Sequence, residues 1–265
     1  MAHTNLNSYG VRLDVEIEDE ALQPAVELIL PPGWQPSAEF PEDGHFTLSG
    51  RADGAYTVLV DGAPIGTGLA ADVAVHVLDA QLRIRVAALA NDRIFVHAGV
   101  VALGQRALLL PGPSFCGKST LVAALVCEGA TYYSDEFAVL DETGSVHPYP
   151  RRLSLRTDGE SYGDYASVET LGGRAGTGPA RPALIAVTAY TPGERWKPQP
   201  HKPGFGALSL LTNTVPANQR PEASIRAVSL AAAHAQILKG DRGEAQETAA
   251  LLLAALKTAG SSSGS

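Results

Sequence analysis

Hydrophobic positions divide the chain into a first part of short runs and a second part of longer apolar runs. In the first part, turn signals such as Pro31-Pro32-Gly33 separate short stretches that favour strands. Strands are expected at 11–17, 25–30, 45–49 and 55–60. Residues 71–90 carry apolar residues at spacings of three and four, which predicts a helix capped by Asp72. The β-branched residues of this stretch also fit a strand, but the length of the stripe favours the helix.

From residue 94 onward the pattern alternates between strands and helices. Apolar runs at 94–103 and 107–111 predict strands, the second of them buried on both faces of a sheet. A glycine-bearing loop then leads into a helix from Lys118 to about Cys127. Later strands are expected at 131–134, 137–141 and 184–190, and the clearest helices at 222–238 and 244–257. The fold class is therefore α/β.

Length and charge support a division into two parts. The 265 residues suffice for a small module and a core of about 150 residues. We expect a β-rich N-terminal part over 1–90 that ends in the helix, a core over 91–260 and a flexible tail over 261–265. The first 90 residues hold 13 Asp and Glu against 4 Lys and Arg, whereas the remainder holds 15 against 16. The less acidic second part is the better host for an anionic ligand.

Composition excludes several classes of protein. A hydrophobic content of 45% argues against a disordered chain, and no apolar run is long enough to cross a membrane. The N-terminus lacks the pattern of a signal peptide. The net charge of -8 does not favour nucleic-acid binding. Two cysteines, Cys116 and Cys127, cannot build a disulfide framework or a zinc cluster, which fits a cytoplasmic protein.

One segment carries a specific chemical signal. Residues 112–119 read GPSFCGKS and match the pattern GxxxxGK[ST] between a predicted strand and a predicted helix. In such a loop, backbone N–H groups bind phosphate oxygens, Lys118 reaches the β- and γ-phosphates, and the Ser119 hydroxyl reaches Mg²⁺. The residues expected to bind the nucleotide are Gly112, Pro113, Ser114, Phe115, Cys116, Gly117, Lys118, Ser119 and Thr120.

Three further features are candidates to complete the site. Asp135 and Glu136 follow a predicted strand, where a carboxylate can hold Mg²⁺ or accept a proton from a hydroxyl. His97 lies on the strand before the loop, where a packed histidine is the ordinary alternative. Three arginines that could clamp phosphate, or could form a solvated basic rim, are Arg151, Arg152 and Arg156.

Taken together, the segments VHAGVV at 96–101, GPSFCGKST at 112–120 and YYSDE at 132–136 resemble the HPr kinase/phosphorylase family and its related kinases. His97 precedes Lys118 by 21 positions, and the acidic pair follows that lysine by 17 and 18, as in the family. Phe115 stands where the family usually has glycine, and Glu136 where it usually has aspartate. The N-terminal part looks most like the β-rich leader of peptide-tailoring kinases from natural-product clusters.

The resemblance implies a P-loop core of the phosphoenolpyruvate-carboxykinase type and an HPr-kinase-like serine phosphotransferase (EC class 2.7). ATP and Mg²⁺ would be the cofactors, held by Lys118 and by Ser119, Asp135 and Glu136. Asp135 would be the general base, and His97 would lie near the transferred phosphate or orient the carboxylate. The acceptor would be a serine of a peptide or small protein, such as a natural-product precursor, with no nucleic-acid or membrane partner. Homo-oligomerisation stays open.

Two other functions remain compatible with the sequence. The chain could be a nucleotide-binding scaffold without kinase activity, which the bulky Phe115 favours. It could also be a small-molecule kinase, in which the acceptor hydroxyl belongs to a metabolite.

Overall fold

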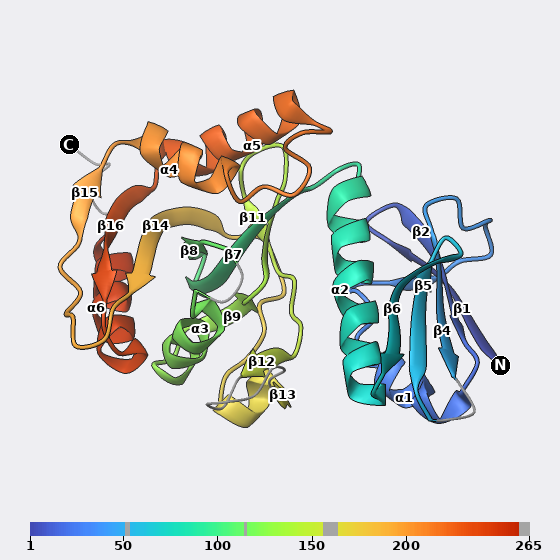
Figure 1. Cartoon of the computed structure of the whole chain (residues 1–265). Helices are drawn as coiled ribbons and strands as arrows, with labels where there is room; N and C mark the ends of the chain where they lie inside the picture. Colours follow the sequence, from blue (N-terminus) through green and yellow to red (C-terminus); the bar gives the residue numbers. More distant parts are fainter. Residues whose placement is uncertain (51–53, 114–115, 156–163, 260–265) are drawn as a thin grey trace. The chain divides into compact units, whose positions relative to one another are not determined.

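A computed structural model describes residues 1–50, 54–113, 116–155 and 164–259 (Figure 1). The chain divides into two compact units, Met1–Asp92 and Arg93–Ser265. The sequence placed this boundary between residues 90 and 91. The expected tail over 261–265 lies outside the described residues. The expected α/β class is confirmed, since both units combine helices with a mixed sheet.

The N-terminal unit is a six-stranded sheet with one long helix packed against it. The strands lie in the order β3-β1-β2-β4-β5-β6, with β2 and β4 parallel and the other neighbours antiparallel. Their bounds are β1 Ala2–Ser8, β2 Val11–Ile17, β3 Gln35–Pro36, β4 His45–Gly50, β5 Tyr56–Val60 and β6 Ala63–Leu69. The helices are α1 Gln23–Glu27 and α2 Ala71–Leu89, with a 3-10 turn at Glu20–Leu22.

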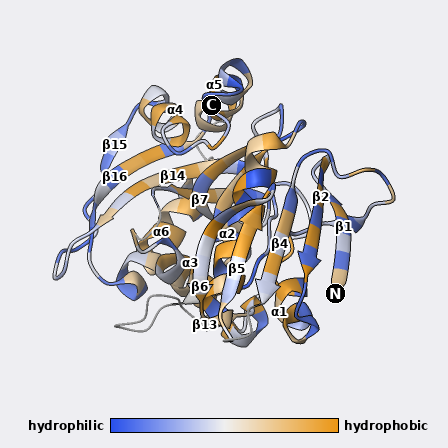
Figure 2. Cartoon of the chain, turned by 45° about the vertical axis from the view of Figure 1, so that its right-hand side comes forward, coloured by the Kyte–Doolittle hydropathy of each residue, from blue (hydrophilic) through white to orange (hydrophobic). Residues whose placement is uncertain are grey.

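Alternation along the strands explains this layering. In β2, the side chains of Val11, Leu13, Val15 and Ile17 are buried between polar residues, and Figure 2 shows the alternation as blue and orange bands. Four members of the predicted helical stripe, Val75, Leu78, Leu82 and Val86, are buried on α2. Burying these apolar faces against each other is the main source of the unit's stability.

Some local predictions in this unit are wrong. Residues 25–30 form no strand, because Pro24 starts the short helix α1 there. Asp72 does not cap α2, since the capping position is Ala70 and Asp72 lies in the first turn. The strands β1, β3 and β6 were not predicted.

The second unit is built on a sheet in the order β11-β10-β7-β8-β14-β16-β15, with β9 paired to β7. Its strands are β7 Ile94–Leu103, β8 Arg106–Pro111, β9 Thr131–Ser134, β10 Phe137–Leu140, β11 Val146–His147, β14 Arg181–Tyr190, β15 Gln199–His201 and β16 Gln236–Arg242. A separate hairpin pairs β12 Leu153–Leu155 with β13 Asp164–Ala166. The helices are α3 Lys118–Cys127, α4 Pro203–Leu211, α5 Pro221–Ala233 and α6 Ala245–Thr258, with a 3-10 turn at Val168–Leu171.

Helices cover both faces of this central sheet. One buried cluster joins α3 and α6 to the sheet through residues such as Leu125, Leu252 and Leu108. A second cluster joins α4 and α5 to the opposite face, where Val228 and Leu109 are both buried. None of the helices in the described part of the chain is long and apolar enough to cross a membrane.

Strand direction gathers one edge of the sheet into a candidate binding region. Strands β8, β14 and β16 are parallel, so their carboxyl ends meet at one edge, where ligands bind in open α/β sheets. Strand β7 runs antiparallel to β8, β9 and β10, which brings its first residues to the same edge.

One core prediction needs correction. The helix expected over 222–238 ends at Ala233, and the residues after Ala235 form strand β16 instead. Ile237 continues the apolar spacing of the helix, but it is buried as part of a parallel strand beside β14. The strands predicted at 94–103 and 107–111 and the helix at 118–127 are confirmed.

Candidate functional site

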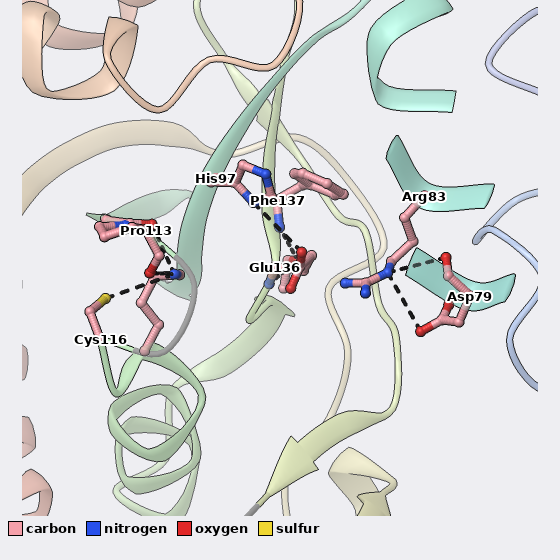
Figure 3. Close-up of polar contacts among 10 residues, drawn as sticks. Asp79, Arg83, His97, Pro113, Cys116, Glu136 and Phe137 are labelled. Atoms are coloured by element: carbon pink, nitrogen blue, oxygen red, sulfur yellow. Dashed lines mark hydrogen bonds and ion pairs between the residues drawn. The ribbon is translucent and has the colours of Figure 1, made fainter. Parts of the chain in front are cut away.

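The GPSFCGKS segment forms the connection between β8 and α3. Gly117 has a φ of 80°, a left-handed conformation that glycine adopts without strain, and it is the N-terminal capping residue of α3. The Lys118 ammonium donates to the carbonyl oxygens of Gly112 at 2.9 Å and Pro113 at 2.6 Å. Figure 3 shows these contacts around Pro113 and Cys116. The lysine thus folds back over its own loop.

This loop has the physical requirements of an anion site. The first N–H groups of α3 lack partners within the helix, and the helix dipole favours a negative charge at this end. Lys118 adds a full positive charge to the same place. Thr120 is exposed in the first turn of α3. Two residues expected to bind the nucleotide, Ser114 and Phe115, lie outside the described residues.

Asp135 is the buried acid of the site. Only 6% of it is exposed, and its carboxylate accepts a hydrogen bond from the Tyr132 hydroxyl at 2.9 Å and one from the Ser119 side chain. Burial raises the pKa of Asp135 above its ordinary value, and the charge of Glu136 acts in the same direction. The two hydroxyl donors and the charge of Arg151 oppose this rise. A raised pKa makes the carboxylate a stronger base.

A short turn fixes the direction of the acidic pair. The Ser134 hydroxyl oxygen accepts the backbone N–H of Glu136 at 3.1 Å and that of Phe137 at 2.9 Å. Ser134 itself is fully buried at the end of β9. Such a side-chain turn allows Asp135 and Glu136 to sit between two strands without leaving buried N–H groups unpaired.

Strand β7 connects the three sequence segments. The N–H of Gly112 donates to the His97 carbonyl at 3.3 Å, and the N–H of Ala98 donates to the Glu136 carbonyl at 3.1 Å. The His97 ring lies 4.7 Å from the Phe137 ring, and its Nδ1 is 3.6 Å from a Glu136 carboxylate oxygen (Figure 3). His97 is therefore a neighbour of Glu136 rather than of Asp135.

The three candidate arginines do not behave alike. Arg151 is partly buried and acts electrostatically on both Asp135 and Tyr132. Arg152 is exposed. Arg156 lies outside the described residues. Arg151 is thus the member of the expected clamp that the structure brings to the acid.

The oxygen atoms of Ser119 and Asp135 are of the kind that Mg²⁺ takes as ligands. The Ser119 hydroxyl and the Asp135 carboxylate are hydrogen-bonded to each other, so one cation could contact both. No group of three or more His, Cys, Asp or Glu within the described ranges is arranged to hold a metal ion. Mg²⁺ commonly uses only one or two protein ligands and completes its shell with phosphate and water oxygens. The residues present therefore fit the ion together with a phosphate ligand.

Two residues of the site were not assigned from the sequence. Tyr132 belongs to the YYSDE segment, but nothing in that pattern reveals that its hydroxyl donates to Asp135. Arg242 donates from Nη2 to the Gly117 carbonyl at 3.0 Å, although the two residues are 125 positions apart. Arg242 lies between the helices predicted at 222–238 and 244–257, so nothing in the sequence pattern indicates that it ends a strand.

The chain matches no protein-family model, no curated protein and no solved structure. Any functional assignment therefore depends on the residues and geometry described above.

Proposed function

We propose that the Arg93–Ser265 unit is an ATP-dependent kinase on a P-loop core of the HPr-kinase type. The observation that carries this proposal is the meeting of a GxxxxGK[ST] loop with a buried carboxylate through Ser119. An anion site beside a base is the minimum that phosphoryl transfer requires, because the protein contributes mainly positioning and charge.

The residues then have distinct tasks. Lys118 and the first N–H groups of α3 bind the β- and γ-phosphates of ATP. Ser119, Asp135 and Glu136 would hold Mg²⁺, which when bound offsets negative charge on the phosphates. His97 orients Glu136 through their contact at 3.6 Å.

In the proposed phosphoryl transfer, Asp135 is the general base. The acceptor hydroxyl oxygen attacks the γ-phosphorus, the bond to the β,γ-bridging oxygen breaks, and ADP leaves. The proton of the hydroxyl passes to the Asp135 carboxylate, whose raised pKa suits it to receive one. The resemblance to peptide-tailoring kinases supports a serine of a cytoplasmic peptide or small protein as the acceptor.

The decisive measurement is calorimetric titration with ATP and Mg²⁺ of the wild type, Lys118→Ala and Lys257→Ala. Lys257 is an exposed lysine near the end of α6 and serves as the matched control. We expect Lys118→Ala to weaken ATP binding by about tenfold or more, since a charged hydrogen bond contributes about 1.5–3 kcal/mol. The control should bind like the wild type. A wild type that binds no ATP would contradict the proposal.

A second measurement separates a kinase from a scaffold. Candidate peptides are incubated with ATP labelled at the γ-phosphate, and label on the peptide is measured by mass spectrometry. Transfer by the wild type and none by Asp135→Asn supports the kinase. ATP binding without transfer to any peptide or metabolite would favour the scaffold.

A further inference from the structure

Arg242 is a buried charged residue that contacts Gly117 of the phosphate loop. It ends β16, and only 3% of it is exposed. Its Nη2 donates to the Gly117 carbonyl at 3.0 Å and its Nη1 to the Gly243 carbonyl at 3.1 Å. The guanidinium carbon lies 5.3 Å from the centre of the Tyr190 ring, and the Tyr190 hydroxyl donates to Glu244 at 3.0 Å. Two backbone carbonyls and one aromatic ring therefore fix the position of the guanidinium.

The charge of Arg242 is not balanced by a direct ion pair. The hydrogen bonds of its guanidinium go to backbone carbonyls rather than to a carboxylate of the described residues, and its Nε has no hydrogen-bond partner among them. Removing a guanidinium from water without a paired anion is costly. Burial accordingly lowers the pKa of Arg242, although Glu244 and the Cys116 thiol pull the other way. A bound anion at the adjacent loop would reduce this cost.

The contact with Gly117 also fixes the direction of a loop peptide. The Gly117 carbonyl accepts both the first helical bond, from Leu121 N–H at 3.2 Å, and the bond from Arg242. A trans peptide points its C=O and N–H in opposite directions, so the N–H of Lys118 is turned away from Arg242. A Cβ at position 117 would lie 2.7 Å from Arg242 Nη2, so only glycine allows this approach.

We propose that Arg242 is a positioning residue that fixes the Gly117–Lys118 peptide at the start of α3 for polyphosphate binding and supplies a fixed positive charge beside it. This inference rests on the proposed function, because it assigns the loop to phosphate binding. Arg242 acts through the Gly117 peptide and through its charge, so its contribution is to ATP affinity rather than to the proton transfer at Asp135.

The test is ATP titration at two salt concentrations for the wild type, Arg242→Met and Arg242→Lys. Arg106→Met is the matched control, because Arg106 also donates to backbone carbonyls, of Lys257 and Ala259, but stands at the start of β8. We expect Arg242→Met to weaken ATP binding about tenfold or more and to reduce its dependence on salt. Arg242→Lys should recover the salt dependence and part of the affinity. Arg106→Met should leave both unchanged.

The outcomes distinguish this inference from the proposed function. Wild-type binding together with Arg242→Met affinity and salt dependence within twofold of the wild type would overturn the role of Arg242 alone. If Arg242→Met does not fold, the Arg242→Lys titration decides. The two contacts of Arg242 use separate nitrogens, Nη1 and Nη2, and lysine has a single nitrogen, so affinity must fall if both contacts matter. A wild type that binds no ATP contradicts the proposed function. Inorganic tripolyphosphate is then titrated into the same variants, and absence of binding there overturns the inference as well.

Discussion

Charged side chains face oppositely charged neighbours on the N-terminal sheet, whereas two charged side chains of the core unit are buried without an ion pair among the described residues. On the N-terminal sheet, Asp14 and Glu16 of β2 lie between His3 of β1 and His45 of β4, with each histidine near both acids. The two histidine side chains are 51% and 42% exposed. In the core unit, Asp135 and Arg242 are almost fully buried, and neither forms an ion pair with another described residue.

The difference lies in whether a charged side chain has an oppositely charged neighbour within the fold. The two acids are largely covered, but each faces exposed histidine side chains across the strands, and pairs that reach solvent in this way contribute little to stability. Buried unpaired charges destabilise a fold unless a ligand or substrate compensates them. The proposed function accounts for two such charges at one sheet edge, beside a glycine-rich loop, because a bound polyphosphate and a transferred proton would compensate them.

The largest expected effect comes from removing the buried base. Asp135→Asn should lower phosphoryl transfer by about 10²–10⁴-fold, the usual contribution of a general base. ATP affinity, measured without Mg²⁺ so that a metal role of Asp135 does not enter, should stay within about threefold, because Lys118 and the loop are unchanged. Transfer of labelled phosphate and ATP titration measure the two quantities, with Glu142→Gln as an exposed control. Transfer at the wild-type rate would remove Asp135 from the mechanism.

Tyr132→Phe should shift the pH dependence of transfer. The Tyr132 hydroxyl lowers the pKa of Asp135, so its loss raises that pKa further. Activity is lost as pH falls through this pKa, and the acidic side of the pH profile should therefore move to higher pH. Stability should fall by about 1–3 kcal/mol, because a buried hydrogen bond is lost.

Tyr133→Phe provides the matched control for that prediction. The Tyr133 hydroxyl donates to the Gly178 carbonyl at 2.8 Å rather than to an acid. This variant should lose stability in denaturant titrations without moving the pH profile. An equal shift in both variants would mean that general loosening, not the Asp135 hydrogen bond, sets the profile.

A smaller effect concerns stability at neutral pH. Because the pKa of Asp135 is higher in the folded than in the unfolded chain, its charged form costs stability above that pKa. Asp135→Asn should therefore unfold at a higher temperature than the wild type at pH 8. The difference should shrink as pH falls through the raised pKa. Calorimetric melting at several pH values measures it, and a variant that is less stable at pH 8 would contradict the destabilising role.

The smallest effect is expected in the N-terminal sheet. His45→Gln removes one of the two exposed histidines that face Asp14 and Glu16. The free energy of unfolding should change by less than about 1 kcal/mol, and ATP affinity should not change. A loss above about 2 kcal/mol in denaturant titration would show that this cluster stabilises the fold as strongly as a buried one.

The sequence predicted those features that depend on local patterns. The apolar run at 107–111, the glycine loop and the helix from Lys118 are adjacent in the chain, so their order alone indicates a strand, a loop and a helix. Features that depend on tertiary pairing were missed. Ile237 fits a helical stripe as well as a buried strand, and only the pairing with β14 decides between them.

The same limit applies to the candidate site. Asp135 and Ser119 could be proposed because each belongs to a recognisable segment. Their hydrogen bond to each other, the donation from Tyr132 and the approach of Arg242 arise from packing between separate elements. Sequence spacing carries no information about such contacts.

The long separation between Gly117 and Arg242 has a consequence for protein synthesis. The loop leaves the ribosome 125 residues before the arginine that supports it. At about 5–20 residues per second, this interval lasts roughly 6–25 s. Strand β16 must then insert between β14 and β15 before the arginine reaches the loop. A nascent chain, or a chain that ends before β16, therefore carries the GxxxxGK[ST] loop without the contact from Arg242, and under the proposed function it would bind nucleotide more weakly.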